Sequence, residues 1–118
     1  MENSKPLEEV WVLSQIRWVE WWSGLRPNTQ TVLSRLYDLT LALSYPYFEG
    51  SIEELAKFSG VSPSVASGSI KQLKEFGIVT IAPGEIAIVI DPSKWRISRE
   101  ERAQLEAYCD RMEKGFKK

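Results

Sequence analysis

Three pairs of adjacent glutamates are the side chains of this sequence best suited to act together as general acid and general base. They are Glu8–Glu9, Glu53–Glu54 and Glu100–Glu101. Each pair falls in the expected first turn of a helix, where acidic side chains interact favourably with the helix dipole. We therefore interpret the pairs as helix-capping groups, and the sequence favours a binding protein over an enzyme.

The sequence lacks the residues that most other catalytic and metal-binding sites require. The chain has no histidine and a single cysteine, Cys109, which excludes histidine-based triads, HExxH zinc sites and an intrachain disulfide. It has no glycine-rich phosphate loop and no GxSxG turn, so an enzyme would have to rely on carboxylates or lysines alone. We expect no catalytic residue, metal or cofactor. Cys109 lies on an apolar stripe and is interpreted as a buried small hydrophobic residue rather than a redox sensor.

The residues most suited to contacting nucleic acid lie between positions 62 and 72. Serine hydroxyls can hydrogen-bond a phosphate or a base edge, and small side chains let the backbone approach a groove closely. Gln72 can form two hydrogen bonds with adenine, and Lys71 can bond phosphate or guanine. The alternative is an ordinary solvated helix face. The candidate DNA-binding set is Ser62, Ser64, Ser67, Gly68, Lys71 and Gln72.

Basic side chains outside this segment could add phosphate contacts. Residues 91–118 carry eight basic against six acidic residues, whereas residues 51–90 carry three against four. The strongest cluster consists of Lys94, Arg96, Arg99 and Arg102. If the fold places this basic cluster beside residues 62–72, the cluster could supply the phosphate contacts that residues 62–72 lack. The alternative is pairing along an exposed helix, such as Arg102 with Glu106. Lys57 is a weaker candidate.

Length and composition fit one intracellular domain. With 118 residues, 43% of them hydrophobic and 26% charged, the chain is predicted to form a single globular domain over residues 1–118. No run approaches the roughly 18 apolar residues that cross a membrane, and the N-terminal residues lack the features of a signal peptide. We expect a cytoplasmic protein with no membrane association.

Hydrophobic periodicity predicts five helices and one β-hairpin, which is a mainly α fold with a small β component (α+β). The predicted helices cover residues 4–23, 28–44, 52–59, 63–76 and 98–116, and the predicted strands cover 78–82 and 85–90. Residues 83–84 form the turn of the hairpin.

Polar capping residues set several of these boundaries. Ser51 with Glu54, and Ser98 with Glu101, have the spacing of capping boxes at helix N-termini. Gly60 is placed to end a helix in the left-handed conformation. Ser62 caps the next helix, with Pro63 at its first position, where a missing N–H costs nothing.

The order of helix, helix, turn, helix and hairpin, with ELAKFSGVSPSVASGSIKQLKEFGIV at its centre, resembles the winged-helix DNA-binding domains of MarR-like and GntR-like regulators and of phage or plasmid replication initiators. The resemblance covers residues 28–90. Its matches are Leu55–Ala56, Gly60–Val61–Ser62, Val65, Ile70, Leu73 and Gly77–Ile78–Val79. It implies a winged helix-turn-helix with extra N-terminal and C-terminal helices, in which residues 63–76 form the recognition helix. Pro63 and Ser67–Gly68 stand where such families commonly have arginines.

Two apolar terminal helices are predicted to form a dimer interface. MarR-like proteins dimerise through helices that flank the winged helix, so the resemblance assigns this role to residues 1–24 and 91–118. The apolar excess of both segments supports the assignment. Stacking of the tryptophans on bases is the less favoured alternative, because Arg17 is the only basic residue between Trp11 and Trp22. The predicted interface consists of Trp11, Trp18, Trp21, Trp22, Leu105, Tyr108, Met112 and Phe116.

The sequence thus predicts a homodimeric transcriptional regulator that binds double-stranded DNA with sequence specificity. The alternative is a protein–protein interaction module of the same fold in a replication, segregation or viral assembly.

Overall fold

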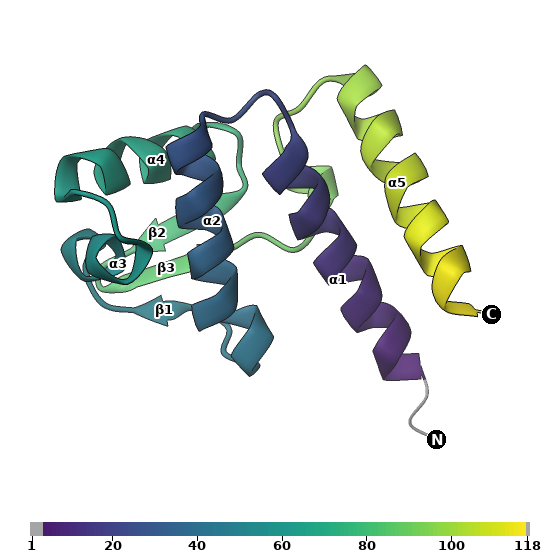
Figure 1. The fold of residues 1–118 in the computed structure, drawn as a ribbon, viewed down its shortest axis with the longest axis horizontal. Helices are drawn as coiled ribbons and strands as arrows, with labels where there is room; N and C mark the ends of the chain where they lie inside the picture. The colour runs from purple at the N-terminus through teal and green to yellow at the C-terminus, as the bar shows by residue number, and fades with distance from the viewer. Residues whose placement is uncertain (1–3, 118) are drawn as a thin grey trace.

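The computed structural model describes the backbone of residues 4–117 and the side chains of residues 13–112 and 114. The fold is mainly helical, with a small antiparallel sheet (Figure 1). The helices are α1 (Ser4–Trp21), α2 (Pro27–Leu39), α3 (Ile52–Ser59), α4 (Pro63–Glu75) and α5 (Arg99–Lys117). The strands are β1 (Phe48–Glu49), β2 (Val79–Ala82) and β3 (Glu85–Ile88). The predicted α+β class and the predicted order of helices are confirmed.

The predicted capping residues fix the ends of α3, α4 and α5. In the box before α3, the Glu54 N–H donates to Ser51 Oγ at 3.1 Å, and the Ser51 N–H donates to Glu54 Oε1 at 2.8 Å. Ser98 and Glu101 form the same pair of bonds at the start of α5. These bonds satisfy N–H groups that have no partner inside the helix. Gly60 ends α3 with a left-handed φ of 73°.

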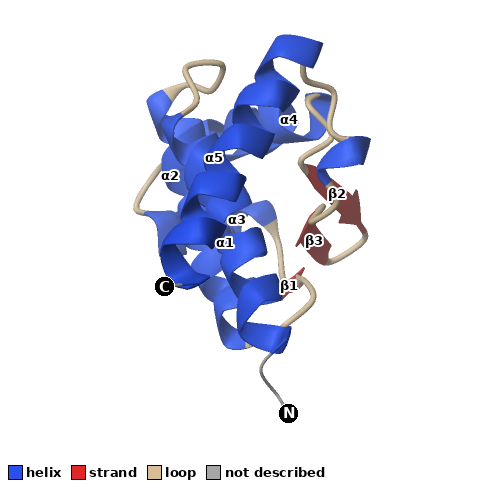
Figure 2. Ribbon diagram, turned by 90° about the vertical axis from the view of Figure 1, so that its right-hand side faces the viewer, coloured by secondary structure: helices blue, strands red, loops and turns tan. Residues whose placement is uncertain are grey.

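The sheet contains one strand more than predicted. The hairpin of β2 and β3 is confirmed, and β1 adds to the other edge of β3, which gives the order β1–β3–β2. Phe48 pairs with Ile86, and both side chains are buried. The strands lie together on one side of the helices (Figure 2).

Two helices end earlier than predicted. Helix α1 ends at Trp21 instead of about Ser23, and α2 ends at Leu39 instead of about Ser44. At the end of α2, the Thr40 hydroxyl donates to the Leu36 carbonyl at 2.7 Å, while the Thr40 backbone leaves the helical region. A short 3₁₀ turn follows at Leu41–Leu43.

The terminal helices pack antiparallel, and α1 lies between α2 and α5 (Figure 1). Their buried side chains join those of α2, α3, α4 and the sheet in one hydrophobic cluster. Ile16 and Val19 contribute from α1, and Leu105 and Cys109 from α5. The prediction that Cys109 is buried is confirmed. Of the helices that the structure describes, none is long and apolar enough to span a bilayer.

Candidate nucleic-acid interface

Helix α4 buries one face and leaves the opposite face open. Its inner residues are Ala66, Ser69, Ile70 and Leu73. The outer face, which we call the α4 outer face, presents Ser64, Ser67, Gly68, Lys71 and Lys74, of which all but the half-buried Gly68 are exposed. The two faces follow from helical periodicity, since residues three or four apart share a side. Four predicted DNA-binding residues, Ser64, Ser67, Gly68 and Lys71, therefore lie together.

Ser62 has a structural role at the start of this helix. Its hydroxyl oxygen accepts from the Val65 N–H at 3.2 Å and lies 3.3 Å from the Ser64 hydroxyl oxygen. The first bond is the N-cap that the sequence predicts. Ser62 remains exposed, but any contact with nucleic acid would share the oxygen that caps α4.

Gln72 is held by the loop between α1 and α2. Its Nε2 donates to the Gly24 carbonyl, and its Oε1 accepts from the Arg26 backbone N–H, both at 3.3 Å. These two bonds fasten the α1–α2 loop to α4. The predicted contact of Gln72 with adenine stays a prediction, and it would have to use the second amide hydrogen and the second lone pair.

The same loop brings an arginine to the α4 outer face. Arg26 Nη2 donates to the Gly68 carbonyl at 3.1 Å, and the side chain is exposed. Sequence reasoning missed Arg26 because it is 42 residues away from Gly68 along the chain. The one signal in the sequence was a glycine in the middle of a helix, which usually has a packing or functional reason.

The basic cluster after the hairpin reaches α4 at the C-terminal end of that helix. Arg96 Nη1 donates to the carbonyls of Lys74 and Glu75 at 3.1 and 2.7 Å. It thereby caps carbonyls that have no partner inside the helix. The structure thus gives Arg96 a helix-capping role, and its contact with phosphate stays a prediction. Arg102 likewise donates to the carbonyls of Pro92 and Trp95.

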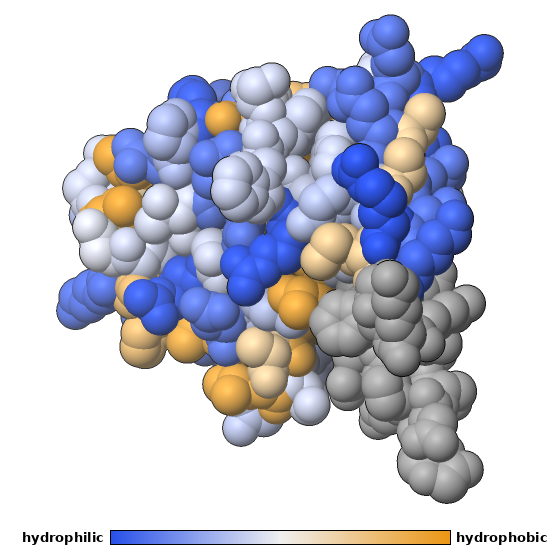
Figure 3. Space-filling model, turned by 45° about the vertical axis from the view of Figure 1, so that its right-hand side comes forward, coloured by the Kyte–Doolittle hydropathy of each residue, from blue (hydrophilic) through white to orange (hydrophobic). Residues whose placement is uncertain are grey.

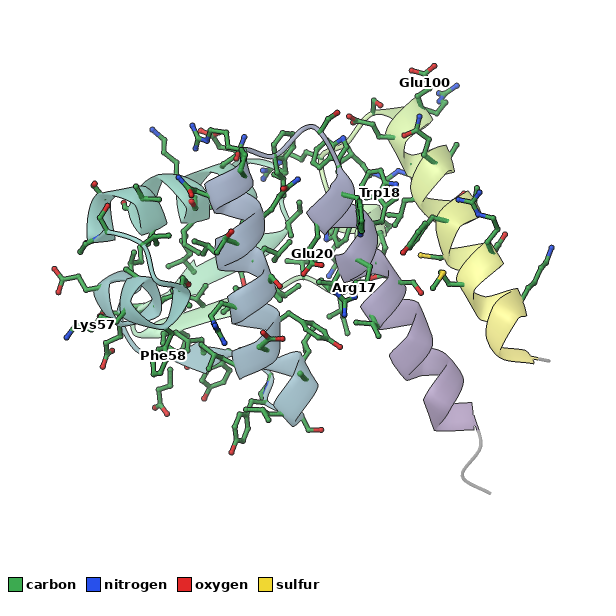
Figure 4. The ribbon with its side chains drawn as sticks, viewed as in Figure 1. Arg17, Trp18, Glu20, Lys57, Phe58 and Glu100 are labelled. Carbon is green, nitrogen blue, oxygen red and sulfur yellow. The ribbon has the colours of Figure 1, made fainter. Side chains whose placement is uncertain are left out.

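The remaining basic residues that the sequence predicted to bind DNA lie away from the α4 outer face. Lys94 and Arg99 are exposed and lie beyond the C-terminal end of α4. Lys57 is exposed on α3 and points outward (Figure 4). The structure therefore does not gather all the predicted basic residues around the α4 outer face.

Three of the predicted dimer residues are buried within the single chain. Trp18, Trp22 and Leu105 pack between α1 and α5. The rings of Trp18 and Trp22 stack at 5.5 Å, and Phe76 meets Trp22 edge-on at 4.8 Å. These residues are thus not part of an open surface, because the terminal helices cover each other.

The other predicted dimer residues differ in exposure. Trp21 is 80% exposed, Met112 is exposed and Tyr108 is half-buried. Trp11 and Phe116 lie outside the described side chains. Trp21 is therefore the most exposed apolar side chain among the predicted interface residues that the structure describes.

One glutamate of each described pair, Glu54 and Glu101, accepts hydrogen bonds at the start of its helix. Glu54 and Glu101 each complete a capping box, which confirms the capping interpretation for these two residues. Glu101 Oε2 also accepts from the Trp22 indole N–H at 2.9 Å. The pKa of Glu101 is lowered chiefly by the hydrogen bond from the Ser98 backbone, with a further contribution from Trp22. Glu8 and Glu9 lie outside the described side chains.

A second open surface lies over the end of α2, β1 and part of α3. Leu43, Tyr45 and Phe58 are 57%, 58% and 55% exposed, and Tyr47 lies beside Tyr45. We call these four residues the aromatic patch. Phe58 points outward from α3 (Figure 4). A shallow hollow of about 320 Å³ adjoins the patch and is lined by Leu39, Tyr45, Pro46, Tyr47, Phe48 and Glu49. Hydrophobic side chains gather toward the lower end of the molecule in Figure 3.

Comparison of the chain with protein families, with curated proteins and with solved structures finds no match.

Proposed function

We propose that this chain is a winged helix-turn-helix protein that binds double-stranded DNA with sequence specificity as a small transcriptional regulator. In this proposal α3 and α4 form the helix-turn-helix, α4 is the recognition helix, and the β2–β3 hairpin is the wing. The order of these elements and the three-stranded sheet support the assignment.

The observation that carries the proposal is the chemistry of the α4 outer face. The major groove of B-form DNA admits an α-helix, and small outer side chains let the helix backbone approach the bases closely. Ser64, Ser67 and Gly68 are small in this way, and Lys71 adds a cation on the same side. The hydroxyls and the ammonium group can donate to phosphates and to base edges.

The charge balance predicts DNA binding that is weak and depends only slightly on salt concentration. The chain has a net charge of −1, and Glu75 follows Lys74 at the end of α4. Each phosphate neutralised by a basic side chain contributes about 0.9 to the slope of log affinity against log salt. With few cations near the α4 outer face, we expect a shallow slope.

An electrophoretic mobility shift at low salt, with random-sequence and genomic duplexes, tests the proposal. The wild-type protein should shift duplex DNA, and Lys71→Ala should weaken binding and reduce the salt slope by about 1. Lys114→Ala is the matched control, because Lys114 is exposed on α5, away from α4. The recognition surface is wrong if the Lys71 and Lys114 variants bind alike. Absence of any shift at micromolar protein would reject DNA binding.

The aromatic patch favours a second candidate, a protein–protein interaction module. Contiguous exposed apolar side chains on a small protein commonly mark a contact with another protein. Leu43→Ser with Phe58→Ser would replace two of the four patch residues and leave α4 unchanged. Under the DNA-binding proposal, this double variant should shift duplex DNA as the wild type does.

A further inference from the structure

We infer that Arg26, from the loop between α1 and α2, reads a guanine in the major groove across the glycine at position 68. The inference rests on the proposed function and names a specificity residue that lies outside the proposed recognition helix. It begins from the bond between Arg26 Nη2 and the Gly68 carbonyl, at 3.1 Å on the α4 outer face.

The backbone of the Gly24–Arg26 segment is hydrogen-bonded to a single side chain of α4, that of Gln72. The Arg26 N–H donates to Gln72 Oε1, and the Nε2 of the same amide donates to the Gly24 carbonyl. Leu25, between them, is buried in the core. The loop is therefore fastened to α4 by one side chain of α4, and this sets the position from which the Arg26 side chain extends.

The Arg26 guanidinium lies over the backbone of Gly68. A Cβ built at position 68 would lie 3.9 Å from Arg26 Nη2, which is van der Waals distance. The backbone of Gly68 does not require glycine, because it is part of a regular helix and its φ is not positive. Glycine lowers helix stability relative to alanine, and the Cβ of an alanine would only reach contact distance of the guanidinium. A longer side chain would displace the guanidinium.

The guanidinium keeps the donors that guanine recognition requires. An arginine carries five N–H groups, and the Gly68 carbonyl is the single acceptor that they reach among the described residues. The Arg26 side chain is exposed, so its remaining donors are open to solvent at Gly68, four residues from Ser64 and three from Lys71 along α4. Two parallel N–H groups match O6 and N7 of guanine, the commonest base-specific contact in the major groove. A lysine has the charge but not the planar pair of donors.

The alternative role of Arg26 is purely structural, as a bridge between the α1–α2 loop and α4. A bridge predicts a change in stability when Arg26 is replaced and no change in base preference. Guanine recognition predicts a change in base preference even where stability is kept. Base preference is therefore the measurement that separates the two roles.

The experiment is selection from a pool of short duplexes with a randomised centre, followed by affinity measurement on the enriched duplex and on an unselected duplex. The wild-type protein is compared with Arg26→Lys and Arg26→Ala. Arg35→Ala is the matched control, because Arg35 is exposed on α2 and its nearest ionic partner is Asp38 at 3.9 Å. Melting temperatures verify that each variant is folded.

The wild-type and Arg35→Ala proteins should enrich duplexes with an invariant guanine at one position. Arg26→Ala should lose preference for that guanine and bind the enriched duplex roughly ten- to a hundredfold more weakly. Arg26→Lys should retain its affinity for the unselected duplex and lose the guanine preference. If Arg26→Ala selects the same guanine with the same affinity, the inference is rejected and DNA binding stands. If the wild-type protein binds no duplex, the proposed function itself fails.

A second test changes Gly68, the other residue of the Arg26–Gly68 contact, to glutamate (Gly68→Glu). Glutamate is a good helix former, so α4 should keep its structure. Its carboxylate would lie beneath the guanidinium and compete with the base for its donors. We expect the guanine preference to disappear with Gly68→Glu and to survive Lys114→Ala. Retention of the preference in a folded Gly68→Glu variant contradicts the inference.

Discussion

Gly77 shows how a single residue joins two segments of the chain. Its φ is 74°, and a Cβ at this position would lie 2.8 Å from the Lys94 carbonyl oxygen and 3.5 Å from the Trp95 Cα. Gly60 has nearly the same φ, 73°, with no atom within 4 Å of an added Cβ. The two glycines therefore separate the cost of a left-handed backbone from the cost of a steric clash.

Gly60→Ala should lower the free energy of unfolding by about 1 kcal/mol, the cost of a left-handed alanine. Gly77→Ala should lower it by at least about 2 kcal/mol, because segment 94–96 must also move. Urea unfolding of both variants measures the difference. Equal losses would mean that the close approach of Lys94 to Gly77 costs nothing.

Glu101 predicts how stability depends on pH. Hydrogen bonds from the Ser98 backbone and the Trp22 indole outweigh partial burial and lower its pKa below the ordinary value of 4.5. A carboxylate with a lowered folded-state pKa adds stability above the ordinary value, and this stability is lost as the pH falls through the folded-state pKa.

The free energy of unfolding of the wild type should therefore exceed that of Glu101→Gln near neutral pH, and the difference should shrink below pH 4.5. Glu100→Gln is the control, since it removes the neighbouring carboxylate and leaves these bonds in place. Chemical unfolding at several pH values gives the comparison. A difference that stays constant across this range would show that the Glu101 charge does not stabilise the fold.

At the scale of elements, local signals predicted the boundaries and long-range packing did not follow from them. Ser51, Gly60 and Ser62 define the ends of α3 and α4 through bonds that span three to five residues. Such bonds depend on the sequence nearby, so residue type and spacing are sufficient to predict them. Strand β1 has only two residues and exists through its pairing with β3, which no local pattern indicates.

In the candidate site too, local sequence predicted some features and long-range packing determined the others. The outward positions of Ser64, Ser67 and Lys71 follow from the helical period, and the structure agrees. The placement of Gln72, Arg26 and Arg96 depends on where two loops meet α4, which the period does not specify. The sequence predicted that a partner chain would bury the apolar faces of the terminal helices. In the structure, α1 and α5 pack against each other, and this packing buries Trp18 and Trp22 within the single chain.

At the scale of the whole molecule, two exposed surfaces are candidates for the binding site. The α4 outer face carries small polar residues and Lys71, with Arg26 beside it, whereas the aromatic patch lies over the end of α2, β1 and part of α3. A symmetric dimer would combine two α4 outer faces and raise a weak affinity through effective concentration. The weak charge of the chain makes this arrangement useful for DNA binding.

Trp21 is the residue through which we expect this dimer to form, because it is 80% exposed while its neighbours Trp18 and Trp22 are buried. Sedimentation equilibrium should give a dimer for the wild type and a monomer for Trp21→Glu, since a buried unpaired carboxylate opposes association. Leu43→Glu, which places the same charge on the aromatic patch, should remain a dimer. Trp21→Glu should also bind duplex DNA more weakly, because one contact surface replaces two. A monomeric wild type would reject the homodimer, and a dimer lost only with Leu43→Glu would move the interface to the aromatic patch.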